Sequence, residues 1–269
     1  MSDYRLGVIG GGNMAEAILR GAIAGGFLPP ADILVSEPDP QRRKALAAVL
    51  PGVRCVDDNP AGAACPAILL AVKPQAMAGV LAGIAPAMSA DAMVISIAAG
   101  ISTAFIGDAL KGKGRIIRVM PNTPMLVGRG MSALCPGPRA SDDDMAWAAA
   151  LFAASGKTCR VSESQMDAVT AVSGSGPAYF FYLVEAMVMA GVAEGLDVAT
   201  ATALAAQTCL GAAEMLARTG LSARELRAKV TSPNGTTQRA IETLDAAGAK
   251  DAIVTAVRAA AHRSRELGA

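Results

Sequence analysis

The stretch RLGVIGGGNMAEA, residues 5–17, decides the fold of this 269-residue chain, because a short apolar run breaks into three glycines and then opens into an alanine-rich helical pattern. Gly10, Gly12 and Ala15 fill the pattern G-x-G-x-x-G/A. In that pattern the first glycine permits a tight turn, the second lets the backbone approach a pyrophosphate, and the last small residue packs helix on strand. Free N–H groups at the helix start would hold the phosphates. A glycine-rich turn can also be purely structural, but its place at the beginning of an α/β pattern favours dinucleotide binding.

Short aliphatic runs recur through the first half of the chain, each followed by alanine-rich helical or loop sequence. This alternation is typical of α/β proteins with a parallel, doubly wound sheet, so we expect an N-terminal Rossmann-like domain over residues 1–162. Two further runs, 131–134 and 158–161, flank an expected helix over 142–154 and close this domain. The recurring runs are residues 6–9, 33–35, 68–72, 94–97 and 116–119.

Beyond residue 162 the strand signals vanish, which predicts an all-helical second domain over residues 163–269. Ser222-x-x-Glu225 is a capping box that starts one of its helices. The apolar tract 178–196 is interrupted by glutamates, so we expect a buried or subunit-interface helix rather than a membrane span. The continuous apolar surface of this domain predicts oligomerisation. The expected helices are 176–196, 198–218, 222–229 and 236–265.

Composition excludes several classes of partner. The net charge is +1 and no basic run is present, which argues against nucleic acid and against an anionic membrane surface. The five cysteines show no paired spacing, so no metal site is expected, and no signal-peptide pattern opens the chain. We therefore expect a cytoplasmic protein with reduced thiols that acts on a small molecule.

The residues after the second expected strand bear on the choice of cofactor. Glu37 is placed to accept hydrogen bonds from the adenosine ribose and would repel a 2′-phosphate, which favours NADH. Ser36, Arg42 and Arg43 lie close by, and two arginines could neutralise a phosphate or simply form a solvated helix start. Both NADH and NADPH stay open as cofactors.

Further candidates lie at later strand ends, where ligands of open α/β sheets gather. Lys73 follows one apolar run and either is merely exposed or contacts cofactor or substrate. Asn122 and Thr123 follow another run and could donate hydrogen bonds.

Two loops of the second domain are also candidates. Residues 173–178 precede its first long helix, and residues 231–237 join later helices. In the second loop small residues let consecutive N–H groups form a nest for a carboxylate, and Ser232, Thr236 and Thr237 add hydroxyls. The alternative for the threonines is a plain helix cap.

The single histidine, His262, lies near the C-terminus in an arginine-rich helical end and is expected to be a surface residue. Alcohol dehydrogenation needs a base such as histidine or lysine to manage the hydroxyl proton. Reduction of an imine has less need of such a base, because a protonated iminium is already electrophilic. Such a site chiefly has to hold substrate and nicotinamide in attack geometry.

Six motifs in this order resemble the pyrroline-5-carboxylate reductase family: GGGNMAEA, LAVKPQ, SIAAGIS, RVMPNTP, GSGPAYFF and VTSPNGTT. The resemblance covers nearly the whole chain, and the last motif is the most specific. The related β-hydroxyacid dehydrogenases carry a catalytic lysine six residues after the first glycine of a G-x-G motif. Here that motif begins at Gly174 and the position is Phe180, which argues against a hydroxyacid substrate.

The resemblance implies NAD(P)H-dependent reduction of L-1-pyrroline-5-carboxylate to L-proline, with hydride passing to ring C5. It assigns Thr237 to a hydrogen bond with the ring nitrogen, which makes it the best catalytic candidate. It places Glu163 near the substrate and implies a homodimer, often five dimers in a ring. The implied substrate loop adds Val230, Ser232, Asn234, Gly235 and Thr236. The implied cofactor contacts are Gly10, Gly11, Gly12, Asn13, Met14, Ser36, Glu37, Asn59, Ala71, Val72, Lys73, Pro74, Ala98 and Ala99.

Three positions depart from the common pattern of that family. Asn234 stands where glycine is frequent, Lys229 where an asparagine occurs in some members, and Glu37 replaces a serine found in members that accept the 2′-phosphate. The alternatives that stay open are a reductase of another cyclic imine or short carbonyl compound and a non-catalytic protein that senses NAD(P).

Overall fold

The computed structural model describes residues 3–267 and divides into two compact units. The first unit contains the residues up to Gly174 and those from Ala260 onward, and the second is Ser175–Ala259. The expected boundary at residue 162 stays a prediction. The two units are described in turn.

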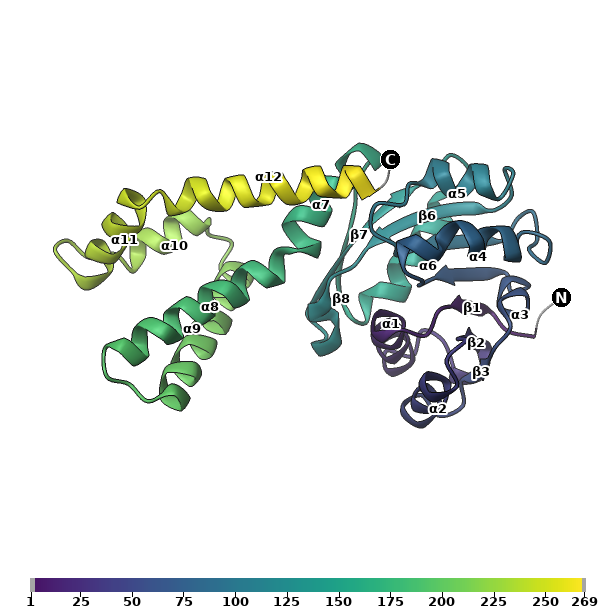
Figure 1. Ribbon diagram of the computed structural model, residues 1–269, viewed down its shortest axis with the longest axis horizontal. Helices are drawn as coiled ribbons and strands as arrows, with labels where there is room; N and C mark the ends of the chain where they lie inside the picture. Colours follow the sequence, from purple (N-terminus) through teal and green to yellow (C-terminus); the bar gives the residue numbers. More distant parts are fainter. Residues whose placement is uncertain (1–2, 268–269) are drawn as a thin grey trace. The chain divides into compact units, whose positions relative to one another are not determined.

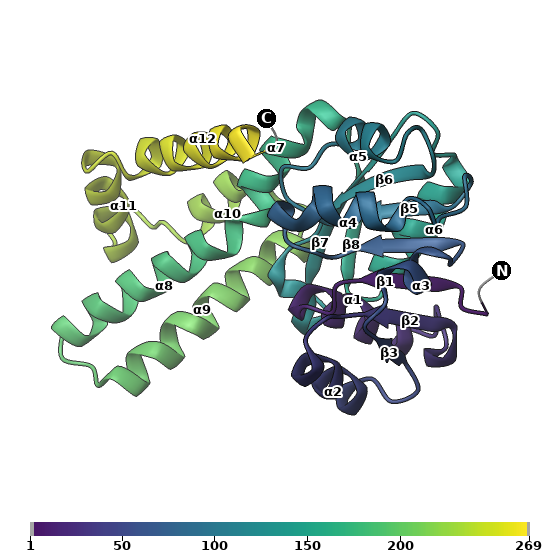
Figure 2. The same ribbon diagram turned by 45° about the vertical axis from the view of Figure 1, so that its right-hand side comes forward.

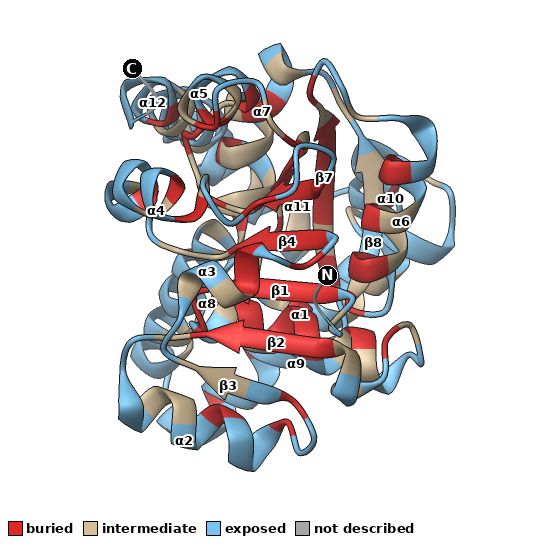
Figure 3. Cartoon of the chain, turned by 90° about the vertical axis from the view of Figure 1, so that its right-hand side faces the viewer, coloured by how far each residue is buried: buried red, intermediate tan, exposed pale blue. Residues whose placement is uncertain are grey.

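The first unit is built on one eight-stranded sheet in the order β3-β2-β1-β4-β5-β6-β7-β8. All neighbouring strands are parallel except β6 and β7, which are antiparallel. The predicted Rossmann-like sheet is confirmed, and Figure 3 shows β1, β2 and β4 buried at its centre. The strands are β1 (Leu6–Ile9), β2 (Ile33–Ser36), β3 (Arg54–Val56), β4 (Ala67–Leu70), β5 (Met93–Ser96), β6 (Arg115–Met120), β7 (Gly130–Pro136) and β8 (Gly156–Arg160).

Helices cover both faces of this sheet and produce two separate cores (Figure 1). One core packs α1, α2 and α6 on one face, and the other packs α3, α4 and α5 on the opposite face. Alternation along the strands divides the side chains: Leu69 of β4 enters the first core, whereas Leu70 enters the second. These helices are α1 (Asn13–Ala24), α2 (Pro40–Val49), α3 (Asn59–Ala63), α4 (Met77–Ile84), α5 (Thr103–Ala109) and α6 (Asp142–Ala153).

The strand order reverses at β1, which has β2 on one side and β4 on the other. In open α/β sheets ligands bind outside the carboxyl ends of the strands at such a switch point. Backbone hydrogen bonds continue past the strand ends there, since Gly10 N donates to Ser36 O at 2.8 Å and Ala71 N donates to Ile9 O at 2.8 Å. The fold therefore fixes the loops after β1, β2 and β4 against one another.

The chain leaves the sheet through a short helical series, η4 (Glu163–Gln165), α7 (Met166–Val169) and the π-helical turn η5 (Thr170–Gly174). The end of α12 (Ala249–Leu267) packs on this series, because Ser264 Oγ donates a hydrogen bond to Asp167 Oδ1 at 2.7 Å. His262 lies exposed near this end, with its Nδ1 3.1 Å from Glu266 Oε1, so its predicted surface position is confirmed.

The second unit begins with α8 (Gly176–Ala193) and α9 (Val198–Arg218), which lie side by side in Figures 1 and 2. Next come α10 (Ala223–Lys229), α11 (Thr236–Ala246) and the first part of α12. Ser222 forms the predicted capping box with Glu225 at the start of α10.

The prediction of one helix over 236–265 is wrong. The chain breaks between α11 and α12 at Gly248, whose φ of 68° lies in the left-handed region. Glycine reaches this conformation without the steric cost of a Cβ atom, so it commonly ends helices.

Helix α8 is apolar yet exposed within one chain. Among its residues only Gly176 is buried, whereas Phe181 is 64% and Tyr182 75% exposed. The alternative that this helix is buried inside the chain is therefore wrong. Within the described residues one helical stretch, Glu163–Ala193, is long and apolar enough to span a membrane by length and composition alone, which is weak evidence for a span.

All five cysteines lie within the described residues and are free thiols. Cys65 and Cys135 are buried, and the other three are half-buried. Burial, the Glu163 charge and a hydrogen bond to Glu163 raise the pKa of Cys135 to about 11, so this thiol stays protonated at neutral pH.

Candidate functional site

The glycine-rich turn between β1 and α1 has the geometry of a phosphate cradle. Gly10 adopts a φ of +96°, and a Cβ there would lie 2.8 Å from Ala71 O, so only glycine fits. A Cβ added at Gly12 would meet nothing within 4 Å, and Gly12 is exposed. Ala15 is fully buried against the sheet. Each position therefore has the property that its predicted role needs.

The amides at the start of α1 are available to a ligand. Gly12 is the N-cap of this 12-residue helix and provides no side-chain cap, and the first intrahelical bond is from Glu16 N to Gly12 O. The N–H groups of Asn13 and Met14 are therefore free for an anion at the positive end of the helix dipole. An open surface above glycine with free amides fits the pyrophosphate of a dinucleotide.

The expected cofactor contacts of the first unit gather along one edge of the sheet. They lie at the carboxyl ends of β1, β2, β4 and β5, where parallel strands place successive loops next to each other. Asn59 starts α3 beyond β3, and its Oδ1 accepts a hydrogen bond from Ser36 Oγ at 2.7 Å. The structure thus brings together residues that are up to 89 positions apart, from Gly10 to Ala99.

Glu37 directly follows β2, and its carboxylate is held against the glycine-rich turn. Its Oε2 accepts a hydrogen bond from Gly11 N at 2.8 Å, and its Oε1 accepts one from Asp39 N at 3.0 Å. A fixed negative charge at the end of the second strand stands where the adenosine ribose of a dinucleotide binds.

Both neighbouring arginines are engaged with the protein. Arg42 donates from Nε to Gly11 O at 2.6 Å and from Nη2 to Glu16 Oε2 at 2.8 Å. Arg43 donates from Nη1 to Glu37 O at 2.6 Å and to Pro38 O at 2.8 Å. Burial acts to raise the pKa of Glu16, but hydrogen bonds and charge from Arg20 and Arg42 outweigh it and lower that pKa. The arginines therefore serve to shape the turn, and their guanidinium groups already have acceptors.

The loops after β4 and β5 complete this edge. Lys73 is exposed and caps no backbone group of the turn η2 (Pro74–Ala76), so its ammonium is accessible to a ligand. Ala98 N donates a hydrogen bond to Ser96 Oγ at 3.3 Å, just beyond the end of β5. Ala71, Val72, Pro74 and Ala99 are half-buried beside them.

Asn122 organises the loop after β6. Its Oδ1 accepts from Met131 N at 2.9 Å, and its Nδ2 donates to Ser173 O at 3.2 Å. The side chain thus ties this loop to β7 and to the π-helical turn η5 before α8. The sequence suggested that Asn122 could donate hydrogen bonds here, and in the structure it donates to the carbonyl and the hydroxyl of Ser173.

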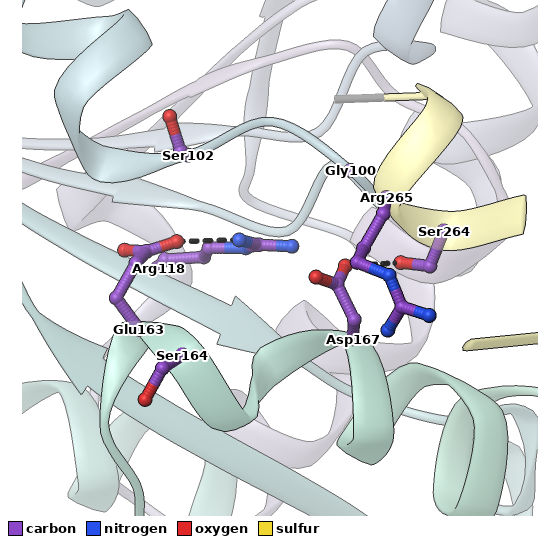
Figure 4. Close-up of a pocket in the computed structure, with 8 residues that line it drawn as sticks. All are labelled: Gly100, Ser102, Arg118, Glu163, Ser164, Asp167, Ser264 and Arg265. Carbon is purple, nitrogen blue, oxygen red and sulfur yellow. Dashed lines mark hydrogen bonds and ion pairs between the residues drawn. The ribbon is translucent and has the colours of Figure 1, made fainter. Parts of the chain in front are cut away.

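A polar pocket of about 400 Å³ lies next to this edge, within the first unit. Figure 4 shows the Arg118 side chain between Glu163 on one side and Asp167 with Arg265 on the other. Arg118 Nη1 and Glu163 Oε1 are 2.5 Å apart. The remaining residues that line the pocket are Gly100, Ser102, Ser164 and Ser264.

Both oxygens of the Glu163 carboxylate accept hydrogen bonds from protein groups, with Arg118 Nη1 donating to Oε1. Its Oε2 accepts from Thr103 Oγ1 at 2.7 Å, from Thr103 N at 3.3 Å and from Cys135 Sγ at 3.7 Å. Burial acts to raise the pKa of Glu163, but the hydrogen bonds from Thr103 and Arg118 and the Arg118 charge hold it below its ordinary value. Sequence reasoning missed the roles of Arg118 and Thr103. The available signal was a lone arginine between Ile117 and Val119 in an apolar strand.

The loop 230–237 of the second unit joins α10 to α11. Gly235 is the N-cap of α11, an 11-residue helix, and offers no side-chain cap. Asn234 adopts a φ of 59° and its N–H donates to Gln238 Oε1 at 2.7 Å, so asparagine tolerates the left-handed position where glycine would be expected.

The threonines of this loop are not helix caps. Thr236 and Thr237 are the first two residues of α11, beyond the N-cap, and within residues 3–267 their hydroxyls make no hydrogen bond. The same holds for Ser232 within that range. Three unpaired hydroxyls and free helix-start amides can recognise a carboxylate and one further polar atom. Val230 is exposed at the beginning of the loop.

Known proteins match this chain in both of its units. A family model described as pyrroline-5-carboxylate reductase dimerisation matches residues 163–267, and one described as NADP oxidoreductase, coenzyme F420-dependent, matches residues 5–100. The chain is 42% identical to a pyrroline-5-carboxylate reductase of Methanosarcina acetivorans over 100% of this chain and 99% of the relative.

Solved structures give the same result. A pyrroline-5-carboxylate reductase from Coxiella burnetii superimposes with a TM-score of 0.92 at 36% identity and full coverage of both chains. The Plasmodium falciparum pyrroline carboxylate reductase with NADP bound superimposes with a TM-score of 0.89 at 28% identity, again over both whole chains.

Proposed function

The chain belongs to the pyrroline-5-carboxylate reductase family, and we infer from this membership and from its two loops that it reduces L-1-pyrroline-5-carboxylate to L-proline with NAD(P)H. In this reaction the C5=N double bond becomes a single bond, C5 gains a hydride and the ring nitrogen carries a proton. A bound nicotinamide would supply the hydride. The residues expected to hold it are those of the glycine-rich turn and of the loops after β2, β4 and β5.

The observation that carries the substrate assignment is the set of unpaired hydroxyls at the start of α11. Pyrroline-5-carboxylate offers one carboxylate and one ring nitrogen, and the loop offers free amides and hydroxyls for both. We assign the carboxylate to the backbone and hydroxyls of residues 232–236 and the ring nitrogen to Thr237 Oγ1. An imine substrate also agrees with the exposed position of His262, since no histidine is placed to act as a base.

The test is nicotinamide oxidation on addition of pyrroline-5-carboxylate. We expect turnover by the wild type and a loss of about 10²-fold in kcat for Thr237→Ala, the size of effect for a donor that acts in the transition state. Thr243→Ala is the matched control, because the Thr243 hydroxyl bonds to Arg239 O within the same helix and faces no ligand loop. Nucleotide binding without turnover would favour a sensor, and equal loss in both variants would remove the special role of Thr237.

We further propose that NADH is preferred over NADPH. The support is the fixed Glu37 carboxylate on Gly11 N and the engagement of Arg42 and Arg43 with other acceptors. Replacing Glu37 by serine removes the repulsion, so the ratio of kcat/KM for NADPH over NADH should rise about tenfold, which corresponds to about 1.4 kcal/mol.

The control for this experiment is Asp39→Ser. It removes a neighbouring negative charge but keeps an N-cap for α2, where Asp39 now accepts from Gln41 N at 2.9 Å. If both variants shift the cofactor ratio equally, the preference reflects general charge and not the Glu37 carboxylate. An unchanged ratio in Glu37→Ser contradicts the proposal.

We also propose that the protein works in the cytoplasm as a homodimer formed through its helical unit, with five dimers in a ring as the larger assembly. Support comes from the dimerisation model over residues 163–267 and from the exposed apolar side chains of α8 and α9. The substrate is a small molecule, and the near-neutral surface suits no nucleic acid or membrane partner.

A further inference from the structure

Glu163 is the meeting point of four elements of the first unit. It begins η4, and its carboxylate accepts hydrogen bonds from Arg118 of β6, Thr103 of α5 and Cys135 of β7. These partners are 28 to 60 positions away in the sequence. One carboxylate therefore joins α5 and the start of η4 to β6 and β7, where Arg118 and Cys135 are direct partners in the sheet.

The pair between Glu163 and Arg118 is constrained by burial. The Arg118 side chain is only 5% exposed, and Glu163 is its single ion-pair partner among the described residues. Arg118 Nη2 has no hydrogen-bond partner within residues 3–267. A buried guanidinium without a counter-charge is strongly unfavourable, so Arg118 holds the Glu163 carboxylate in place as firmly as Glu163 holds Arg118.

The bonds of Glu163 lead to the loop after β5, which carries the expected cofactor contacts Ala98 and Ala99. Thr103 is the first residue of α5 and lies four positions after Ala99, in the loop that leaves β5. Arg118 lies in β6 two positions before Met120, where the loop containing Asn122 begins. Fixing Thr103 and Arg118 together fixes the loops that leave two neighbouring parallel strands.

We propose that Glu163 is a positioning residue, which through Thr103 sets the loop 98–102 for the nicotinamide and does not itself contact the substrate. This inference rests on the proposed function. The bonds of both Glu163 oxygens argue for it, because Oε2 accepts from the hydroxyl and the amide of Thr103 and Oε1 accepts from Arg118. The family resemblance placed Glu163 near the substrate, and that direct contact stays a prediction which the experiment below tests.

The test compares Thr103→Val with Thr103→Ser. Valine keeps the shape and the backbone N–H but loses the hydroxyl, whereas serine keeps the hydroxyl donor to Glu163. We expect the dissociation constant of the nicotinamide nucleotide, measured by calorimetry without substrate, to rise about tenfold in Thr103→Val, as for loss of one charge-assisted hydrogen bond. Thr103→Ser should restore binding close to that of the wild type.

The pH profile adds a readout that a purely structural role would not move. The hydroxyl of Thr103 helps to keep the pKa of Glu163 low, so its loss raises that pKa. The carboxylate then protonates at a higher pH on acidification and releases Arg118. Nucleotide affinity of Thr103→Val should therefore begin to fall at a higher pH than that of the wild type or of Thr103→Ser.

Two outcomes overturn the inference. One is a Thr103→Val variant with unchanged nucleotide affinity and a raised KM for pyrroline-5-carboxylate alone, which would make Glu163 a substrate contact. The other is equal behaviour of the valine and serine variants. If Thr103→Val does not fold, Glu163→Asp replaces it, because it keeps the charge for Arg118 but shortens the reach to Thr103, and its nucleotide affinity must fall. Absence of turnover by the wild type contradicts the proposed function instead, and the binding data still decide the role of Thr103.

Discussion

The two units of this chain treat apolar side chains in opposite ways. In the first unit all four residues of each of the strands β1, β2, β4 and β5 are buried, and a core lies on each face of the sheet. In the second unit α8 and α9 together bury only Gly176, Ala201 and Ala205. One unit therefore buries its hydrophobic surface within a single chain, and the other leaves that surface exposed.

The polar side chains of the two units also differ, in how many hydrogen bonds they make within the chain. Charged side chains of the first unit, such as Glu37 and Glu163, are held by several donors each. The hydroxyls of Ser232, Thr236 and Thr237 in the second unit make no hydrogen bond within the described residues. Polar side chains of the first unit are thus fixed by the protein, whereas the loop hydroxyls of the second unit stay available to a ligand. Under the proposed function, the first group would hold the cofactor and the second would meet the substrate.

The largest expected effect is in the first unit. Phe152 of α6 is 1% exposed in the core shared with α1. Replacing it by alanine leaves a cavity, so Phe152→Ala should lower the free energy of unfolding by about 3–5 kcal/mol. Urea denaturation at two protein concentrations measures this, and the loss should be the same at both because the contacts lie within one chain.

The control for this variant is Phe105→Ala in the same unit. Phe105 is 40% exposed, so its truncation removes less buried area and should cost clearly less. A concentration-dependent loss in Phe152→Ala would contradict the view that the first unit is complete in one chain.

The sequence was sufficient to predict the sheet but not the contacts between distant segments. Central strands were recognised because they are buried on both faces and read as continuous apolar runs. The three residues of β3 were missed because this edge strand is short and no more than half-buried. The break at Gly248 was missed because the helical pattern continues on both sides of it.

Site residues show the same limit. Glycine positions and the hydroxyl loop were predictable because their chemistry is local. The link between Glu163 and Thr103 spans 60 positions and depends on how β6, β7 and α5 pack, which no local pattern encodes. The engagement of Arg42 with Gly11 O is likewise a tertiary contact that no local pattern encodes.

A smaller effect is expected in the second unit and should depend on protein concentration. Phe180, Phe181 and Tyr182 are consecutive and exposed on α8. Successive residues of a helix point about 100° apart, so the three side chains sample most of its circumference. When each of them is replaced by alanine in turn, at least one variant should have a dimer dissociation constant raised about tenfold, which corresponds to about 1.4 kcal/mol.

Sedimentation velocity over a dilution series measures this constant for each variant. Val127→Ala is the matched control, since Val127 is as exposed as Tyr182 but belongs to the first unit. The residue with the largest effect identifies the face of α8 that meets the partner, because a contact on one face leaves the other two side chains in solvent. A monomeric wild type, or three variants that dissociate like the control, would show that the exposed apolar helices have another use. The two units would then still differ in their apolar surface, but the exposed helices of the second unit would serve something other than contact with a second copy of this chain.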